Sequence, residues 1–524
     1  MQGVKEVSDI VFVGSGIASG FTLLHIIKTL SSDCNSPNLK ITLIDKYGDF
    51  FKGIPYGKRS GDTVLLINSL KSFLPEDERK SFILWIKDNK ESLISNFLDK
   101  GGREAKRWFE ANKNEINQNK WDDLFVPRTF FGNYISEILN KAIEKAISGN
   151  IINLNFITSE VIDYENSEDI SHLILDSGEI IQARSTVLCV GSLPYKKICE
   201  IEFGSESSDM LLINDLYSPG VDENINKIED FIKKRRKDKE TNVLVIGANA
   251  SGLEAVYKLN SSVLSRQSIN NYVMLSTNGV LPESNINSNI KNEYNPSNLL
   301  ALQKKKQIEA IDIREAAIKD IKKAQTMGLG VASTVGVISD SFKFLLDKLD
   351  EIELENFACK YGNEIGKHQR CAGGHYTSVV DELKQSNKFT HLTGRFSEIR
   401  KTEKGRIKLV YEDSLKKEHL YPIEFDILIN CMGSINFEDS TLPPLLKNLK
   451  DKNYIQINLS KIGIKTNNFE ASRNLYVMGP LLAGNVIDGK ALWHLEHCGR
   501  IIWTSNLLSR VLVQNQKGVS NRVE

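Results

Sequence analysis

The chain of 524 residues lacks several features that would point to particular functions. Its 67 Lys and Arg residues are balanced by 67 Asp and Glu residues, so it has no basic excess of the kind that nucleic-acid binding needs. No apolar run approaches the ~20 residues of a membrane-spanning helix, and the first residues lack the basic start and apolar core of a signal peptide. We therefore expect a cytoplasmic protein with no membrane span and no nucleic-acid partner.

Cysteine and histidine are placed too sparsely for a metal centre or a redox pair. The seven cysteines are odd in number and show no C-x-x-C or metal-knuckle spacing, which argues for reduced thiols. His494 and His497 have no further ligand at a matching position, and two ligands do not make a metal site. No G-x-S-x-G elbow follows a predicted strand. The sequence thus predicts no metal, no disulfide chemistry and no serine-hydrolase site.

The N-terminal segment has the pattern of a strand, a glycine turn and a helix. Residues 9–13 (DIVFV) are rich in β-branched and aromatic residues and lead into the turn GSGIASG, which an apolar-rich segment follows. In such a turn the first glycine permits the bend, the second lets the backbone approach a pyrophosphate, and helix N–H groups face the anion. The next predicted strand ends in Asp45, where a ribose-binding acid belongs. We therefore expect Gly14, Gly16 and Asp45 to contact a dinucleotide.

The same pattern recurs in the middle of the chain. Residues 242–246 (NVLVI) precede the turn GANASG, residues 247–252, and a helical segment. Asn249 stands at the middle glycine position, just as Ser19 replaces the third glycine of the first turn. Asn tolerates left-handed backbone better than other non-glycine residues do. Two such turns in one chain predict two bound nucleotides.

Three further segments have the character of buried parallel strands. Each is an apolar run that ends at a glycine, as expected where a strand leaves a parallel sheet toward a ligand. These runs are residues 185–190, 425–432 and 474–478, which end at Gly191, Gly433 and Gly479. Along the chain the order is therefore a glycine turn, a crossover, a second glycine turn, a return and a final strand.

This order resembles that of two-dinucleotide flavoproteins, in which an FAD domain is interrupted by an NAD(P)H domain and then resumes. Shorter motifs resemble the FAD–NAD(P)-binding family that includes uncharacterised bacterial oxidoreductases and N-hydroxylating flavin monooxygenases. They are residues 53–56 (GIPY), residues 65–68 (LLIN), Phe82, Trp85, residues 125–128 (FVPR), Gly132, Tyr134 and residues 279–283 (GVLPE). The resemblance implies an α/β fold with two Rossmann-like dinucleotide-binding domains and helical insertions.

The resemblance also implies how the chain is divided. The first part of the FAD-binding domain is expected in residues 1–195, with a helical insertion at about 58–124, and its final part in residues 436–524. The NAD(P)H-binding domain is expected in residues 196–435, with a second helical insertion at about 284–396. Additions of this kind commonly carry substrate specificity.

The residues expected to bind the two cofactors follow from the same resemblance. For FAD they are Gly14, Ser15, Gly16, Ile17, Ala18, Ser19, Asp45, Lys46, Asn68, Arg128, Gly479, Asp488 and Gly489. For NAD(P)H they are Gly247, Asn249, Ser251 and Gly252. Asn68 and Arg128 are expected near the flavin. The segment that ends at Lys490 is expected to open a helix whose N-terminus points at the flavin ring.

Cofactor preference and the second insertion are less sharply defined. NADPH-selective domains often place an arginine after the second strand, but here residues 272–275 are followed by Ser276, Thr277 and Asn278. We therefore expect modest discrimination between NADH and NADPH. Residues 370–376 form an irregular, glycine-containing patch with functional side chains, and we interpret its His375 as a loop residue without a role.

The resemblance implies an FAD-dependent NAD(P)H oxidoreductase. In this hypothesis it is a monooxygenase that uses O₂ to oxidise a small molecule, such as an amine or amino acid nitrogen, through a flavin C4a-peroxide. No catalytic side chain is assigned, because the cofactor carries the chemistry. One alternative is an NAD(P)H:acceptor reductase or oxidase without oxygen insertion. Another is a nucleotide-sensing interaction protein with vestigial turnover, which the degenerate turns at Ser19 and Asn249 would suit.

Overall fold

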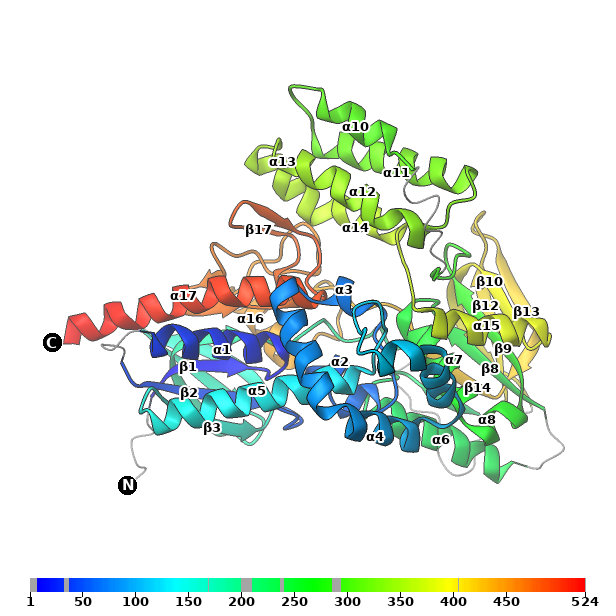
Figure 1. Ribbon diagram of the computed structural model, residues 1–524, viewed down its shortest axis with the longest axis horizontal. Helices are drawn as coiled ribbons and strands as arrows, with labels where there is room; N and C mark the ends of the chain where they lie inside the picture. The colour runs from blue at the N-terminus through cyan, green and yellow to red at the C-terminus, as the bar shows by residue number, and fades with distance from the viewer. Residues whose placement is uncertain are drawn as a thin grey trace.

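The computed structural model describes residues 7–32, 37–167, 169–198, 210–235, 240–284, 294–403 and 405–523. Two separate sheets with parallel cores form the framework, and helices lie against both of them (Figure 1). The chain builds most of the first sheet, passes to the second, and returns to the first near its C-terminal end. This is the α/β architecture that the sequence predicts.

The first sheet has eight strands in the order β15-β16-β6-β1-β2-β3, with β4 and β5 attached beside β6. Strand β1 runs parallel to both β2 and β6, so these three strands end at the same edge of the sheet. The strands are β1 (Ser8–Val13), β2 (Leu39–Asp45), β3 (Ile152–Thr158), β4 (Val161–Ser167), β5 (Ile170–Leu175), β6 (Ile180–Leu188), β15 (Glu470–Ser472) and β16 (Leu475–Val477). Helix α1 (Ile17–Ser31) packs against α5 (Arg128–Ser148) and α17 (Cys498–Val523), and α16 (Pro444–Asp451) packs against β4.

The second sheet has five parallel strands in the order β10-β9-β8-β14-β7. Its strands are β7 (Leu211–Ile213), β8 (Thr241–Ile246), β9 (Ile269–Ser276), β10 (Phe389–Thr393) and β14 (Ile427–Asn430). Its helices are α6 (Val221–Lys234), α7 (Ala250–Ser261), α8 (Val263–Ser268) and α15 (Gly374–Gln385). A three-stranded antiparallel sheet, β11 (Arg395–Lys401), β12 (Ile407–Glu412) and β13 (Glu418–Phe425), follows β10. Strand β8 is buried along its whole length, as a central parallel strand should be.

Two helical additions stand on this framework. The first contains α2 (Gly53–Tyr56), a 3₁₀ turn at Lys58–Ser60, α3 (Leu70–Phe73) and α4 (Glu76–Asn117), which kinks at Gly102, where φ is +56°. The second is a cap above the two sheets (Figure 1), with α10 (Ser297–Gln303), α11 (Ala310–Thr326), α12 (Val331–Leu346), α13 (Glu351–Asn356), a π-helical turn at Phe357–Tyr361 and α14 (Gly362–Lys367). The helices of the cap share a hydrophobic core to which Ala491 of the later strand at Lys490–Leu492 also belongs.

The segment after Gly479 differs from the sequence prediction. Instead of opening a helix, it forms the hairpin of β17 (Asn485–Ile487) and β18 (Lys490–Leu492). Asp488 and Gly489 occupy its two-residue turn, with φ of +48° and +68°. An Asp-Gly pair between apolar residues favours this type of turn, because both positions require positive φ. Helix α17 begins only at Cys498.

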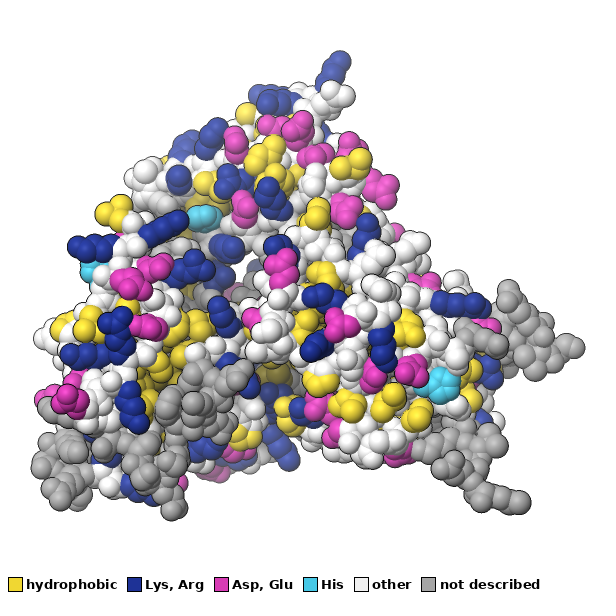
Figure 2. Space-filling model, turned by 180° about the vertical axis from the view of Figure 1, so that it is seen from behind, with side chains coloured by type: hydrophobic (Ala, Val, Ile, Leu, Met, Phe, Trp, Pro, Cys, Tyr) yellow, Lys and Arg dark blue, Asp and Glu magenta, His cyan; other side chains and the backbone are white. Residues whose placement is uncertain are grey.

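The surface carries charges of both signs. Figure 2 shows basic and acidic side chains interspersed over the face that it displays, as the equal totals of the two kinds of residue would suggest. Within the described part of the chain, no helix combines the length and the apolar character needed to cross a membrane.

Candidate functional site

The first glycine turn begins where β1 leaves its sheet. The Gly14 N–H donates to the carbonyl of Ile44 on β2 at 2.8 Å, and the φ of Gly14 is +92°. A Cβ at this residue would lie 2.4 Å from the carbonyl oxygen of Cys189, just past the end of β6. The backbone angle and the close approach of a second segment therefore both require glycine here.

The Asp45 carboxylate holds this turn from the end of β2. One of its oxygens accepts hydrogen bonds from the N–H and the hydroxyl of Ser15, at 3.1 and 2.9 Å. The other accepts from the N–H groups of Tyr47 and Gly48, at 2.9 and 3.0 Å. A carboxylate offers about four acceptor positions, so a ribose hydroxyl would bind Asp45 by displacing the rotatable Ser15 hydroxyl. Neighbouring Lys46 forms an ion pair of 2.6 Å with Glu160.

Helix α1 behind this turn is tightly packed. The Ser19 hydroxyl donates to the carbonyl of Gly16 at 2.8 Å, so the buried residue at the third glycine position leaves no polar group unpaired. The methyl group of Ala18 would lie 3.4 Å from a Cβ on Gly479. Ser505 of α17 donates to the Ala18 carbonyl at 3.4 Å. The first turn, the end of β16 and α17 therefore meet at one place.

The second glycine turn repeats this geometry at the end of β8. The Gly247 N–H donates to the carbonyl of Leu275 on β9 at 2.9 Å, and the φ of Gly247 is +112°. A Cβ on Gly247 would lie 2.1 Å from the carbonyl oxygen of Cys431, just past β14. A Cβ on Gly252 would lie 2.2 Å from the carbonyl oxygen of Gly247. Both glycines are needed for the close packing of this turn.

Both helix starts suit an anionic group. Helix α1 begins at Ile17 after Gly16, and α7 begins at Ala250 after Asn249, and neither preceding residue caps its helix with a side-chain hydrogen bond. Neither first turn contains an acidic residue. Free N–H groups and the positive end of the helix dipole are the donors that a pyrophosphate requires. The two turns therefore fit the phosphates of two dinucleotides, and Ser251 lies within the first turn of α7.

The two polar residues expected near the flavin lie on neighbouring segments. Residues 65–68 and 125–128 are joined by an isolated bridge between the two stretches. Asn68 is half-buried just before α3. Arg128 begins α5, and its guanidinium forms a buried ion pair with Glu254 on α7. Arg128 therefore connects the first part of the chain to the helix of the second glycine turn.

Helix α7 carries three polar side chains that are almost completely buried. Glu254, Lys258 and Asn260 are 0, 8 and 2% exposed. Besides its ion pair with the first part of the chain, Glu254 accepts a hydrogen bond from the Tyr217 hydroxyl at 2.5 Å. The Lys258 ammonium donates to the hydroxyl of Thr63, in the first insertion, at 2.7 Å. Buried polar groups are costly unless paired, so these contacts fix α7 against the first insertion.

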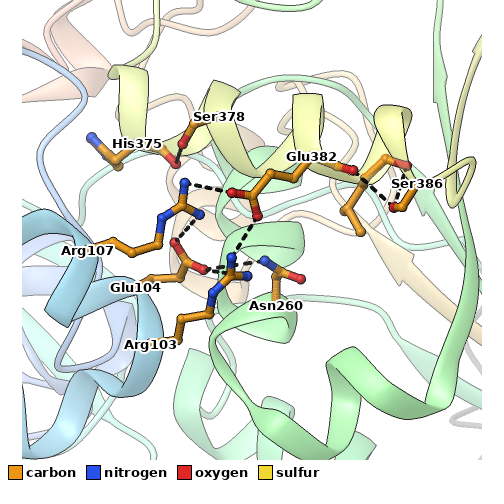
Figure 3. Close-up of polar contacts among 9 residues, drawn as sticks. Arg103, Glu104, Arg107, Asn260, His375, Ser378, Glu382 and Ser386 are labelled. Carbon is orange, nitrogen blue, oxygen red and sulfur yellow. Dashed lines mark hydrogen bonds and ion pairs between the residues drawn. The ribbon is translucent and has the colours of Figure 1, made fainter.

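A charged cluster extends this contact to α15 (Figure 3). Asn260 donates to Glu104 on α4 at 3.4 Å, and Glu104 lies between Arg103 and Arg107. The same two arginines pair with Glu382 on α15, at 3.0 and 2.7 Å. Burial of Glu104 raises the pKa of its carboxyl group. The cluster thus joins α4, α7 and α15 through groups that lie away from both glycine turns.

His375 lies in a helix, so its expected position in a loop is wrong. It is the second residue of α15, and its ring centroid lies 5.7, 5.9 and 4.1 Å from those of Phe125, Tyr257 and Tyr376. Burial, with a smaller effect of nearby Arg128, lowers the pKa of His375 to about 3. Its Nε2 has no hydrogen-bond partner among the described residues. The imidazole is therefore a neutral part of an aromatic cluster.

Two contacts at the second turn could not be foreseen from the sequence. The Arg370 guanidinium donates to the side-chain oxygen of Asn249, although 121 positions separate the two residues. On β10, a ring nitrogen of His391 lies 2.7 Å from the hydroxyl of Ser276 at the end of β9. NADPH-selective domains often place an arginine directly after the second strand, which is β9 here. The arginine near this turn is instead Arg370, from the segment that follows the cap. In the sequence, only the position of Arg370 in the glycine-containing patch of residues 370–376 indicated that it could be functional.

Comparison with known proteins agrees with this geometry. The model of a family described as FAD-NAD(P)-binding matches residues 11–193, which include the first turn, the two motif segments around Asn68 and Arg128, and β6. Uncharacterised proteins of Mycobacterium tuberculosis and Mycobacterium bovis are 29% identical to the chain over 521 residues, which cover 98% of this chain and 96% of theirs.

Solved structures share the fold of this chain over nearly its whole length. An ornithine hydroxylase from Pseudomonas aeruginosa aligns with 97% of this chain and 99% of its own, at 14% identity and a TM-score of 0.54. A cadaverine monooxygenase of desferrioxamine biosynthesis from Erwinia amylovora aligns with 97% of this chain and 95% of its own, at 11% identity and a TM-score of 0.55. Together with the family match over residues 11–193, these structures show that the chain has the fold of FAD/NAD(P)-binding flavoproteins with two dinucleotide-binding domains.

Proposed function

We propose that the protein is an FAD-dependent NAD(P)H monooxygenase that oxidises the nitrogen of a small amine or amino acid with O₂. The observation that carries the proposal is the matched pair of glycine turns, at Gly14 and Gly247, each pressed against a carbonyl and followed by an uncapped helix. One turn alone would suit a single nucleotide. Two turns on two sheets suit a hydride donor and a flavin acceptor in one chain.

The proposed division of the chain follows the sheets. Residues 1–195 and 436–524 would bind FAD, because β1, β2, β6 and β16 form one sheet. Residues 196–435 would bind NAD(P)H, because β8, β9 and β14 lie together in the other. The two helical insertions would then lie at about 58–124 and 284–396.

The chain's own residues would hold and orient the cofactors. In this proposal the FAD set is Gly14, Ser15, Gly16, Ile17, Ala18, Ser19, Asp45, Lys46, Asn68, Arg128, Gly479, Asp488 and Gly489, and the NAD(P)H set is Gly247, Asn249, Ser251 and Gly252. Bound FAD would supply hydride acceptance and oxygen chemistry. The buried pair of Arg128 and Glu254 would keep the second turn at a constant position relative to the first. The cap would help to exclude water from the bound cofactors.

The choice of monooxygenase rests on the fold of the neighbours. The hydroxylase and the monooxygenase described above share the arrangement along the whole chain, and their names specify ornithine and cadaverine. Both molecules carry a primary amine on a short aliphatic chain. A small amine is therefore the substrate class to test first.

The decisive experiment uses the purified full chain supplied with FAD. NAD(P)H consumption is measured with and without ornithine, lysine or cadaverine, under ¹⁸O₂, and the products are analysed by mass spectrometry. We expect one amine to stimulate consumption and to gain a single ¹⁸O atom. NAD(P)H consumption that yields only hydrogen peroxide or a reduced acceptor, whatever amine is offered, would instead identify an oxidase or reductase. A preparation that binds no flavin would contradict both readings.

A further inference from the structure

Arg370 reaches the second glycine turn from a distant part of the chain. It follows α14 at the end of the cap and precedes Cys371, which forms a parallel bridge with Glu283. The Ala372 N–H donates to the Glu283 carbonyl at 3.0 Å, so the backbone beside Arg370 is anchored. From this position the guanidinium donates to the side-chain oxygen of Asn249, the residue immediately before α7.

The charge around Arg370 is not balanced by a bonded acid. Within the described part of the chain, no carboxylate forms an ion pair or hydrogen bond with its guanidinium, and partial burial lowers its pKa. The charge of Glu496, which accepts a hydrogen bond from the Ser192 hydroxyl at 3.2 Å, partly offsets this lowering of the Arg370 pKa. Cations are favourable near the C-termini of helices and unfavourable near their N-termini. A guanidinium beside the start of α7 therefore adds positive potential where the helix already provides it.

The side chain of Asn249 explains how this cation is held. The residue replaces the middle glycine of the turn, and its side chain does not cap α7. Its oxygen is instead the acceptor for Arg370. The residue that replaces the usual glycine, Asn249, is therefore also the residue that holds a second anion-binding group, the Arg370 guanidinium, at this turn.

We propose that Arg370 binds the pyrophosphate of NAD(P)H together with the N–H groups at the start of α7, and that Asn249 positions it. The inference rests on the proposed function, because that proposal assigns the second turn to NAD(P)H. The 2′-phosphate of NADPH belongs instead near the end of β9, where Ser276 and His391 lie. Arg370 therefore contributes equally to the binding of NADH and NADPH, and it does not select between them.

The test compares Arg370→Gln with the wild-type protein, both loaded with FAD. Equilibrium binding of NAD⁺, NADP⁺, ADP-ribose and adenosine is measured by calorimetry. Loss of a charge-assisted hydrogen bond is expected to weaken NAD⁺, NADP⁺ and ADP-ribose binding by a similar factor, about tenfold to a hundredfold. Adenosine, which has no pyrophosphate, should bind unchanged. Arg370→Lys should recover part of the loss.

The control is Lys367→Gln, which removes an exposed positive charge from the end of α14. It should leave all four affinities unchanged, and FAD content and thermal unfolding should match the wild type in every variant. Unchanged ADP-ribose binding in Arg370→Gln would overturn the inference, and so would a loss confined to NADP⁺. If the wild-type protein binds neither NAD⁺ nor NADP⁺, the proposed function itself fails.

A double-mutant cycle separates the role of Asn249 from general damage to the turn. Asn249→Ala removes the acceptor for Arg370, so it should weaken ADP-ribose binding severalfold in the wild-type background. In the Arg370→Gln background the same substitution should have little further effect. Additive losses would show that Asn249 does not act through Arg370.

Discussion

The two glycine turns are alike in their backbone but differ in what supports them. Helix α1 of the first turn packs against α5 and α17, and its buried residues are mostly apolar. Its buried serine and threonine bond to the helix itself, as Ser19 does with Gly16. Helix α7 of the second turn also has buried apolar residues, but in addition it buries Glu254, Lys258 and Asn260, each paired with a residue outside its own helix.

This difference separates a self-contained site from a dependent one. The first turn is supported by packing around its own sheet, which needs no exact pairing of charges. The second turn is supported by polar contacts with the first insertion and by Arg370 from beyond the cap. Changes of Thr63 or Glu104, the residues of the first insertion that contact α7, should therefore disturb the second nucleotide site more than the first.

The largest effect is expected from Glu254→Ala, which leaves Arg128 buried without its acid. Removing one partner of a buried ion pair costs about 3–5 kcal/mol of stability. Urea unfolding of the FAD-loaded protein measures the loss. Replacing both partners, as in Arg128→Met with Glu254→Leu, should recover most of it because no charge remains buried. Equal losses in the single and double variants would show that the loss does not come from a charge left buried without its partner.

The next effect distinguishes the two turns directly. Gly14→Ala and Gly247→Ala both place a Cβ against a carbonyl oxygen, at a residue whose φ is positive. Such strain costs about 1–3 kcal/mol, and we expect at least a tenfold loss of affinity at the altered turn. Gly14→Ala should lower FAD content, whereas Gly247→Ala should retain FAD and lose NAD(P)H binding. The matched control is Gly178→Ala, whose φ is also positive but whose Cβ would meet nothing within 4 Å.

A smaller, pH-dependent effect is expected from His375, which lies between Arg128 and the aromatic residues around α7. Its pKa is about 3 in the folded protein and about 6.5 in an unfolded chain. The unfolded chain therefore binds a proton first, and stability is lost as pH falls from about 6.5 toward 3. His375→Phe should reduce this acid-induced loss by about 1 kcal/mol or more. Urea unfolding at pH 7 and pH 5 tests it, with the exposed His368→Gln as control.

The smallest effect should come from Ser19→Ala in the first turn. It removes one neutral hydrogen bond, to a Gly16 carbonyl that also accepts from the Gly20 N–H at 3.0 Å. We expect a loss of about 0.5–1.5 kcal/mol in urea unfolding. A loss as large as that of Glu254→Ala would contradict the view that α1 depends less than α7 on buried polar contacts.

Local sequence patterns were sufficient to predict the strands that end at a glycine. The strands at residues 9–13 and 242–246 were predicted because a buried parallel strand is a continuous apolar run, and its exit requires positive φ. The start of the final helix was predicted wrongly, because residues 491–497 have a helix-like pattern of apolar residues. The Asp488-Gly489 pair, which favours a two-residue hairpin turn, indicated the hairpin that the structure contains. The assignment of FAD and NAD(P)H contacts residue by residue stays a prediction.

The sequence by itself determined the α/β fold and the two glycine turns, because both depend on short-range backbone geometry. Only the tertiary structure decided that Arg128 meets Glu254, that Arg370 meets Asn249, and that His375 is buried. The first two pairs lie 126 and 121 positions apart in the chain. Their partners are selected by the packing of whole helices and by the cost of burying an unpaired polar group, which no local spacing reveals.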